Sequence, residues 1–145
     1  MAITSAVCTS FKQELLVGTH NFTATSGNTF KLALYTSSAS LGAGTTAYST
    51  SNEITNSSGT AYTAGGSALT SVTPTTDSTT AVCDFADLSF TNASFTANGC
   101  LIYNDTNSDK ACVVVAFGGD KTVSSGTFTI QFPTADATSA IIRLA

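Results

Sequence analysis

Hydrophobic and polar positions follow a helical period near the start of this chain and an alternating period after it. In the first segment, the apolar positions are Val7, Cys8, Phe11 and Leu15, and the polar positions on the other side are Lys12, Gln13 and Glu14. This spacing predicts a short helix over residues 4–17. Thr4 or Ser5 could cap its start, and Gly18 is placed to end it.

From residue 30 onward, apolar and polar residues alternate in short runs, as is typical of β-strands. Gly, Pro, Asn and Asp separate these runs at intervals of roughly 8–12 residues. The predicted strands cover residues 30–35, 61–63, 67–73, 79–88, 99–103, 110–117, 127–132 and 141–144, with a long loop at 37–52 and turns at 104–109 and 118–120. Residues 30–35 alternate and should be half-buried. The nearly continuous apolar run at 110–117 should be covered on both faces, and it forms the clearest hairpin with residues 99–103.

About eight short strands with regular turn signals predict a mainly β fold. We expect a single-domain β-sandwich or jelly roll over residues 1–145, with one short N-terminal helix. A chain of 145 residues fits one domain and can bury a core without a metal or a disulfide. The sequence contains no internal repeat and no linker, which argues against a solenoid or a multidomain arrangement.

The low content of charged residues is the most informative feature of the composition. Charged residues make up 10% of the chain, against about 25% in an average soluble domain, while Ser and Thr make up roughly a third. A surface with so little charge is poorly protected against association. Either partner chains cover much of this surface, or the protein functions outside the cell.

The charge balance argues against two classes of partner. The net charge is −4, and the five basic residues are scattered along the sequence. Nucleic acid binding needs clustered Lys and Arg, and a membrane surface needs a polybasic patch, so we expect neither partner. The first residues lack the basic start of a signal peptide, and no apolar run is long enough to span a membrane. We therefore expect synthesis in a cytoplasm.

Residues that could carry catalysis are few and separated. His20 is the only histidine, and no GxSxG motif is present, so we predict a loop or capping role for His20 and no enzyme activity. Asp84 and Asp87 would point to opposite faces of a strand, which weakens a two-carboxylate glycosidase. We assign no catalytic, cofactor-binding or metal residues.

Two further clusters have a structural and a functional interpretation. The turn holding Asn104, Asp105, Asn107 and Asp109 could bind Ca²⁺, but it lacks a full EF-hand loop, and ordinary Asx-turn hydrogen bonding explains its composition. The tyrosines could form a sugar-binding platform, but they are spread along the sequence and no Trp accompanies them. These tyrosines are Tyr35, Tyr48, Tyr62 and Tyr103.

The four cysteines are Cys8, Cys83, Cys100 and Cys112. None forms a CxxC pair, so a zinc site is not expected. The last three lie in apolar, strand-like segments, which favours buried free thiols. One disulfide among the four is the alternative, and the sequence does not select the pair.

Three stretches of the sequence carry a resemblance to known proteins. They are residues 29–38 (TFKLALYTSS), residues 52–54 (NEI) followed by 59–66 (GTAYTAGG), and residues 127–133 (TFTIQFP). In these stretches the chain resembles small virion proteins of tailed bacteriophages, and it is similar to head decoration, or cement, proteins. That resemblance implies a β-sandwich that sits on the capsid as a trimer, with no catalytic residues.

Low charge and an edge strand are consistent with this resemblance. A C-terminal strand at residues 141–144 would offer an unpaired edge to a neighbour. We expect a capsid decoration protein in the virion whose partners are the major capsid protein and copies of itself, most simply as a homotrimer. The alternatives are a tail component or receptor-binding module that uses the loop at 37–52, and an extracellular adhesin or filament subunit.

Overall fold

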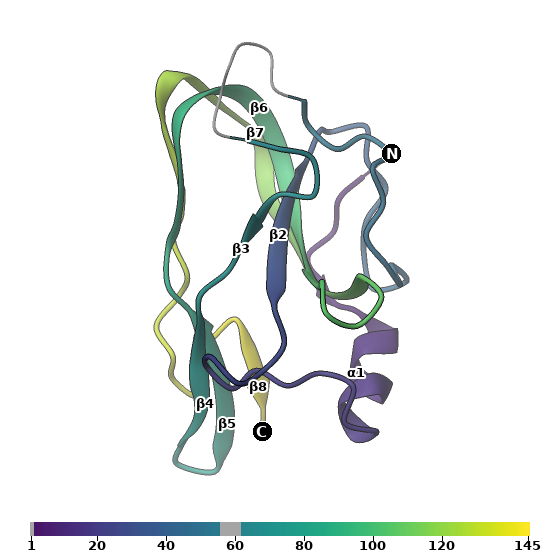
Figure 1. Ribbon diagram of the computed structural model, residues 1–145, viewed down its shortest axis with the longest axis vertical. Helices are drawn as coiled ribbons and strands as arrows, with labels where there is room; N and C mark the ends of the chain where they lie inside the picture. The colour runs from purple at the N-terminus through teal and green to yellow at the C-terminus, as the bar shows by residue number, and fades with distance from the viewer. Residues whose placement is uncertain (1, 56–61) are drawn as a thin grey trace.

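The computed structural model describes residues 2–55 and 62–145, and its elements are arranged as two antiparallel sheets with one short helix (Figure 1). Within these residues the elements are β1 (Ala6–Val7), α1 (Thr9–Leu16), β2 (Phe30–Tyr35), β3 (Ser67–Ala68), β4 (Ser71–Asp77), β5 (Thr80–Phe85), β6 (Leu88–Asn104), β7 (Lys110–Ile130) and β8 (Ile142–Leu144). One sheet has the order β1-β7-β6-β2-β3, and the other has the order β4-β5-β8. The prediction of a mainly β sandwich of about eight strands with a short helix is confirmed.

Strand β2 lies between β6 and β3 in the larger sheet, with Leu32 opposite Ile102 in the antiparallel register. Every residue of β2 except Lys31 is buried, so the prediction of a half-buried strand is wrong. The reason is the loop at residues 37–52, which covers the second face of the strand. The Tyr35 hydroxyl donates a hydrogen bond of 2.7 Å to the Ser49 carbonyl in that loop.

The β6–β7 hairpin is the longest feature of the fold, and it bends so that its two halves lie in different layers (Figure 1). Phe117 and Phe128 show the bend, because their ring centroids lie 6.1 Å apart although eleven extended residues would span roughly 36 Å. We predicted that residues 118–120 end the strand, and this is wrong. Gly118 and Gly119 have φ of +76° and +143° and form a bulge through which β7 continues.

Helix α1 is shorter than predicted and begins at Thr9, because residues 6 and 7 pair with β7 as the short strand β1. Cys8 therefore takes the N-cap position that was predicted for Thr4 or Ser5, without a side-chain cap. Gly18 ends the helix as predicted. Its N–H bonds to the Leu15 carbonyl at 3.2 Å and the next N–H bonds to the Glu14 carbonyl at 2.9 Å, which is a Schellman motif.

Strand β4 differs from its prediction because it runs through Pro74 instead of ending before it. The proline sits where the pairing with β5 shifts register, between Val72 and Thr75. Strand β4 is also an edge of its sheet, where a missing backbone N–H is tolerated. The strand predicted at residues 61–63 is not formed at 62 and 63, and Ala61 lies outside the described residues.

Several predictions are confirmed. The loop at 37–52 contains no named strand, the turn at 104–109 joins the predicted hairpin, and residues 142–144 form a C-terminal strand. Residues 111–114 are buried, as predicted for a strand covered on both faces, but residues 110 and 115–117 of the predicted run are only partly buried. Among the described residues, strand β8 pairs with β5 alone, so it is an edge strand.

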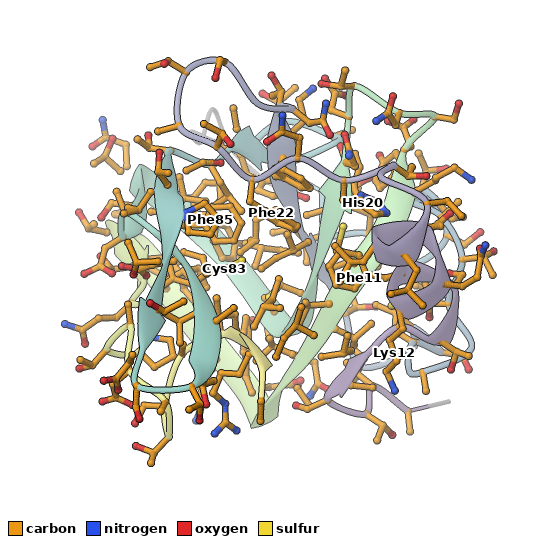
Figure 2. All side chains as sticks on the ribbon, turned by 90° about the horizontal axis from the view of Figure 1, so that it is seen from below. Phe11, Lys12, His20, Phe22, Cys83 and Phe85 are labelled. Carbon is orange, nitrogen blue, oxygen red and sulfur yellow. The ribbon has the colours of Figure 1, made fainter. Side chains whose placement is uncertain are left out.

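An aromatic core joins the helix to both sheets. Phe22 stacks on Phe30 with centroids 4.1 Å apart, and Phe85 packs against both rings. Figure 2 shows Phe11, Phe22 and Phe85 converging from the helix, the following loop and β5, while Lys12 points away from them. Burial of these rings favours folding, by about 1.5–3 kcal/mol for each fully buried side chain.

Candidate functional site

The bend of the β6–β7 hairpin leaves an apolar cleft of about 560 Å³ between its two halves. The walls come from both halves of the hairpin, from β2 and from the chain that follows β7. The lining residues are Leu32, Cys100, Ile102, Val115, Phe117, Lys121, Phe128, Thr129, Ile130, Gln131, Phe132, Pro133 and Ile141. This volume falls within the range of roughly 300–1,000 Å³ that is usual for ligand pockets.

The cleft is open because the two layers do not close over it. Phe117, Phe128 and Phe132 are only partly buried, although all three pack against the core. Phe128 contacts Phe95 at a centroid distance of 5.0 Å, and Phe132 contacts Phe85 at 5.4 Å. One side of each ring is thus packed, and the other side lines an apolar surface that a partner could cover.

An unpaired strand edge lies beside this cleft. Strand β1 pairs with β7 only at Val113 and Val114, and in the described part of the chain no strand pairs with the outer side of β7 after that point. Residues 122–131 of this edge contain no charged residue and no proline. Soluble proteins usually protect such an edge with charges or proline, so the backbone groups of this edge are open to pairing with another strand.

The edge is bent rather than flat, which limits how a partner can use it. The register between β6 and β7 shifts around Ala93, and Asn92 and Ser125 have φ of +51° and +46°. Bulges of this kind twist a strand and interrupt regular pairing. The edge therefore forms an irregular rim beside the cleft rather than a straight template for pairing.

Lys121 is the one charged residue that lines the cleft. Its side chain is exposed, and among residues 2–55 and 62–145 it makes no ion pair. The neighbouring carboxylate of Asp120 instead accepts a hydrogen bond of 2.9 Å from the Asn98 side chain. The cleft thus combines an apolar wall with one positive charge.

A separate polar cluster lies behind the helix, where Glu14 and His20 are both buried. His20 Nε2 lies 3.1 Å from Glu14 Oε1, and Lys110 Nζ lies 2.9 Å from Glu14 Oε2. Glu14 was predicted on the exposed side of the helix, and this is wrong. His20 and Lys110 lie outside the helix, so the helical pattern does not reveal them. Their hydrogen bonds compensate for the burial of the Glu14 charge.

The hydrogen bonds define which nitrogen of His20 carries the proton. Asn104 Oδ1 accepts the N–H groups of Thr106 and Asn107 at 3.1 and 3.2 Å, so its amide nitrogen faces His20 Nδ1, at 3.0 Å. An amide NH₂ can only donate, so Nδ1 is the acceptor and Nε2 carries the proton toward Glu14. His20 lies in the loop after the helix, as one of the two predicted roles required, and its hydrogen bonds connect the helix to the β6–β7 turn.

Cys112 also lies near this histidine, in an order that resembles a thiol–imidazole–carboxylate triad. Its Sγ atom is 3.9 Å from His20 Nδ1, but that lone pair already accepts from Asn104. The Cys112 side chain is fully buried, and burial raises the pKa of its thiol. The arrangement gives Cys112 neither a free base nor access to a substrate.

The Glu14 carboxyl has a lowered pKa although its side chain is buried. Burial by itself would raise that pKa, but the hydrogen bonds from Lys110 and His20 outweigh it and hold the pKa below its ordinary value. Glu14 is consequently ionised at neutral pH. The charge ties α1 to the start of β7 through Lys110.

The four tyrosines come together around Glu53, although the sequence separates them. The Glu53 carboxylate accepts hydrogen bonds from the Tyr62 and Tyr48 hydroxyls at 2.5 and 2.6 Å. The Tyr103 ring stacks on Tyr48 at 4.7 Å, and Tyr35 lies close enough for Glu53 to act on its pKa. Burial raises the pKa of every hydroxyl in this cluster, so all four remain protonated at neutral pH.

This cluster anchors the loops and is not a sugar platform. Glu53 also accepts the Gly65 N–H at 2.7 Å, and the Tyr103 hydroxyl donates to the Gly65 carbonyl at 2.6 Å. The hydroxyls are thus used to hold the loops on either side of residues 56–61 to the sheet. A buried, fully bonded network of this kind specifies one loop arrangement.

The other candidate residues take structural roles. Asp84 bonds to the Phe85 N–H and Asp87 to the Phe132 N–H, each at 2.8 Å. Asp105 pairs with Lys31 at 3.3 Å, and the Asn104 bond to the Thr106 N–H is the expected Asx-turn. In the described part of the chain, no group of three His, Cys, Asp or Glu side chains is placed to hold a metal ion.

The cysteines are free thiols, as the sequence favoured. Burial raises the pKa of Cys8 and Cys83 to about 11 and that of Cys100 to about 12. Only Cys83 is partly exposed. Thiols with such pKa values are unreactive near neutral pH.

The cleft was not visible in the sequence. Phe128 and Phe132 were predicted as parts of an alternating strand, and Lys121 was one of five scattered basic residues. The paired glycines were the available signal, because they mark a bend that brings distant parts of β7 together. The residues gain a shared surface only through that bend.

In comparisons with known proteins, no family model, no curated protein and no solved structure matches the chain. None of the helices in residues 2–55 and 62–145 is long and apolar enough to cross a membrane.

Proposed function

We propose that this chain is a non-enzymatic structural protein of a bacteriophage virion that decorates and stabilises the head. Its partners would be the major capsid protein and copies of itself, with a homotrimer as the expected assembly. The protein would be made in the host cytoplasm and exposed on the particle. The resemblance of the sequence to virion proteins supports the assignment to a phage particle. The open apolar cleft supports a role in assembly.

The observation that carries the assembly role is the open apolar cleft at the uncharged edge of β7. Contiguous exposed apolar surface is uncommon on proteins that function alone, and it marks contact sites. Backbone groups along the rim can also pair with an added strand. A chain with only 10% charged residues adds little electrostatic repulsion against such contacts.

The polar clusters around His20 and Glu53 support the part of this proposal that the chain is not an enzyme. The single imidazole is buried and has both nitrogens engaged, one with Glu14 and one with Asn104. Glu53 is engaged by Tyr48, Tyr62 and a backbone N–H. Both groups are used to hold loops and the helix in place.

Immunogold electron microscopy on virions from the source lysate tests this function, with an antibody that binds the native recombinant chain. Label over the heads is the expected result. Label confined to tails would replace decoration with a tail or receptor-binding role for the loop at 37–52. Label on neither would contradict the virion assignment and leave an extracellular adhesin or filament subunit.

A further inference from the structure

Two of the four cysteines lie opposite each other, where β1 runs beside β7. The last residue pair within these strands is Val7 and Val113. One residue further, the Cys8 N–H donates a hydrogen bond of 2.9 Å to the Cys112 carbonyl, and the Cys8 backbone is still extended, with φ of −64° and ψ of 139°. The antiparallel pairing therefore continues through both cysteines, although Cys8 is also the N-cap of α1.

This placement suits a disulfide. The Cα atoms of a directly opposite antiparallel pair are about 4.5–5.5 Å apart, and disulfides join Cα atoms about 4.4–6.8 Å apart. Opposite side chains also leave the sheet on the same face. Both cysteines are fully buried, and the Cys8 thiol contributes to the raised pKa of the Cys112 thiol, so the two groups are within electrostatic reach of each other.

No strong hydrogen bond holds the two thiols apart. Cys8 Sγ lies 3.9 Å from the Gly42 carbonyl, and Cys112 Sγ lies 3.6 Å from the Lys110 carbonyl and 3.9 Å from His20 Nδ1. Thiols are weak donors and weak acceptors. Rotation of the two sulfur atoms toward each other therefore gives up little.

The other two cysteines have no cysteine opposite them. Cys83 is paired with Ile142 in the smaller sheet. Cys100 lies between Leu34 on one side and Val115 on the other. The strand registers thus select one pair among the four thiols, which the sequence alone does not.

We propose that Cys8 and Cys112 form a disulfide when the chain meets an oxidising environment, and that this bond fastens the start of α1 to β7. Thiols stay reduced in a cytoplasm, so the bond closes only outside the cell. A cross-link between these positions closes a loop of roughly 100 residues, which stabilises the fold by restricting the unfolded chain. The inference goes beyond the proposed function, because the pairing follows from the fold alone.

The oxidant is a small disulfide such as glutathione disulfide. One cysteine thiolate attacks a sulfur of this disulfide and releases one glutathione thiolate, and the other cysteine thiolate then attacks the protein sulfur and releases the second. The two cysteines lose two protons and two electrons, which reduce one glutathione disulfide to two thiols. Burial raises the pKa of Cys8 to about 11, so the reaction is slow in the folded chain near neutral pH.

Refolding of the full chain in a buffer of reduced and oxidised glutathione tests the pairing without the barrier of burial. Circular dichroism establishes that the chain has refolded, and mass spectrometry of the alkylated, unreduced digest identifies the cross-linked peptides. The expected result is one cross-link, between Cys8 and Cys112, with Cys83 and Cys100 outside it. A cross-link between any other pair, or no cross-link in the refolded chain, would overturn the inference.

Two alanine variants make the test specific. Cys8→Ala should abolish the cross-link, whereas Cys100→Ala, which also removes a buried thiol, should leave it in place. A new cross-link in Cys8→Ala, or its loss in Cys100→Ala, would show that the fold does not select this pair.

Thermal unfolding tests whether the bond fastens the helix to the sheet. The oxidised wild type should melt roughly 5–15 °C above its reduced form, and Cys8→Ala should show no such difference. An oxidised chain that melts no higher than the reduced one would contradict this role. Immunogold labelling of virions is independent of these results, so a failed disulfide and a failed virion assignment are distinguishable.

Discussion

Phe117 and Phe128 belong to the same strand, and their rings nevertheless face each other across the two layers with centroids 6.1 Å apart. This relationship is the origin of the candidate site. A straight β7 would extend past the core, whereas the bent strand returns over it and encloses an apolar cleft. The position of the bend at two glycines links a local feature of the sequence to the surface that we propose as a contact site.

Truncation of Phe128 should loosen the outer half of the hairpin. Phe128→Ala removes contacts with Phe95 and Phe117, and the side chain is only partly buried, so we expect a loss of about 1–3 kcal/mol in the free energy of unfolding. Urea unfolding followed by circular dichroism measures it. The exposed neighbour Thr127 provides the control through Thr127→Ala, which should leave the midpoint nearly unchanged. Equal midpoints for wild type and Phe128→Ala would show that the halves of β7 do not pack in solution.

The bend itself should depend on the backbone freedom of Gly118. Its φ of +76° is strained for other residues, most of all for a β-branched one, so Gly118→Val should destabilise the protein by about 1–3 kcal/mol. Gly44→Val is the matched control, because an added Cβ there meets no atom within 4 Å and its φ is not positive. Thermal unfolding compares the two. A Gly44 variant that is as unstable as the Gly118 variant would argue against strain at the bend.

Removal of the Glu14 charge should reduce stability in a pH-dependent way. Glu14→Gln leaves His20 and Lys110 without their anionic partner, so we expect a loss of about 1–3 kcal/mol at pH 7. The folded-state pKa of Glu14 lies below its ordinary value of 4.5, so its contribution is complete above that pH and is lost as the pH falls through the folded-state pKa. Urea unfolding of wild type and variant between pH 7 and pH 3 should show the difference shrinking toward acid.

The control for Glu14 is Asp120→Asn, which changes an exposed carboxylate that hydrogen-bonds only Asn98 in the described part of the chain. Its effect should stay below about 0.5 kcal/mol. A difference between wild type and Glu14→Gln that grows toward acid would contradict the assigned direction of the pKa shift.

The thiols should react in two groups. Cys83 is partly exposed and has a pKa of about 11, so it should be alkylated slowly at pH 8 and faster as the pH rises toward 11. The other three are buried and should react only after unfolding. Intact mass spectrometry after iodoacetamide treatment counts the labels. Fewer than four labels in denaturant without reductant would reveal a disulfide that the folded structure does not contain.

Much of the fold follows from local sequence patterns. The alternating run at residues 30–35, the Asn- and Asp-rich turn at 104–109 and the glycine after the helix each specify their own element. These predictions succeed because neighbouring residues determine the outcome. The start of the helix was placed too early because pairing between residues 6–7 and β7 overrides helical propensity.

The candidate site depends on contacts between distant residues, which local patterns do not contain. Glu14 is polar and was expected outside, but Lys110 and His20 compensate for its burial. The tyrosines converge on Glu53 only after the loops fold over β2. The cleft similarly exists only once β7 bends, so the sequence signals a bend at the glycines but not the surface that results.

The copy number of the chain in purified virions is the most direct test of the proposed function. Quantitative mass spectrometry of gradient-purified particles would compare peptides of this chain with those of the major capsid protein. The account predicts a fixed stoichiometric ratio between the two that persists through repeated banding. Absence of the chain, or a trace that declines with each purification step, would contradict a role as a head decoration protein.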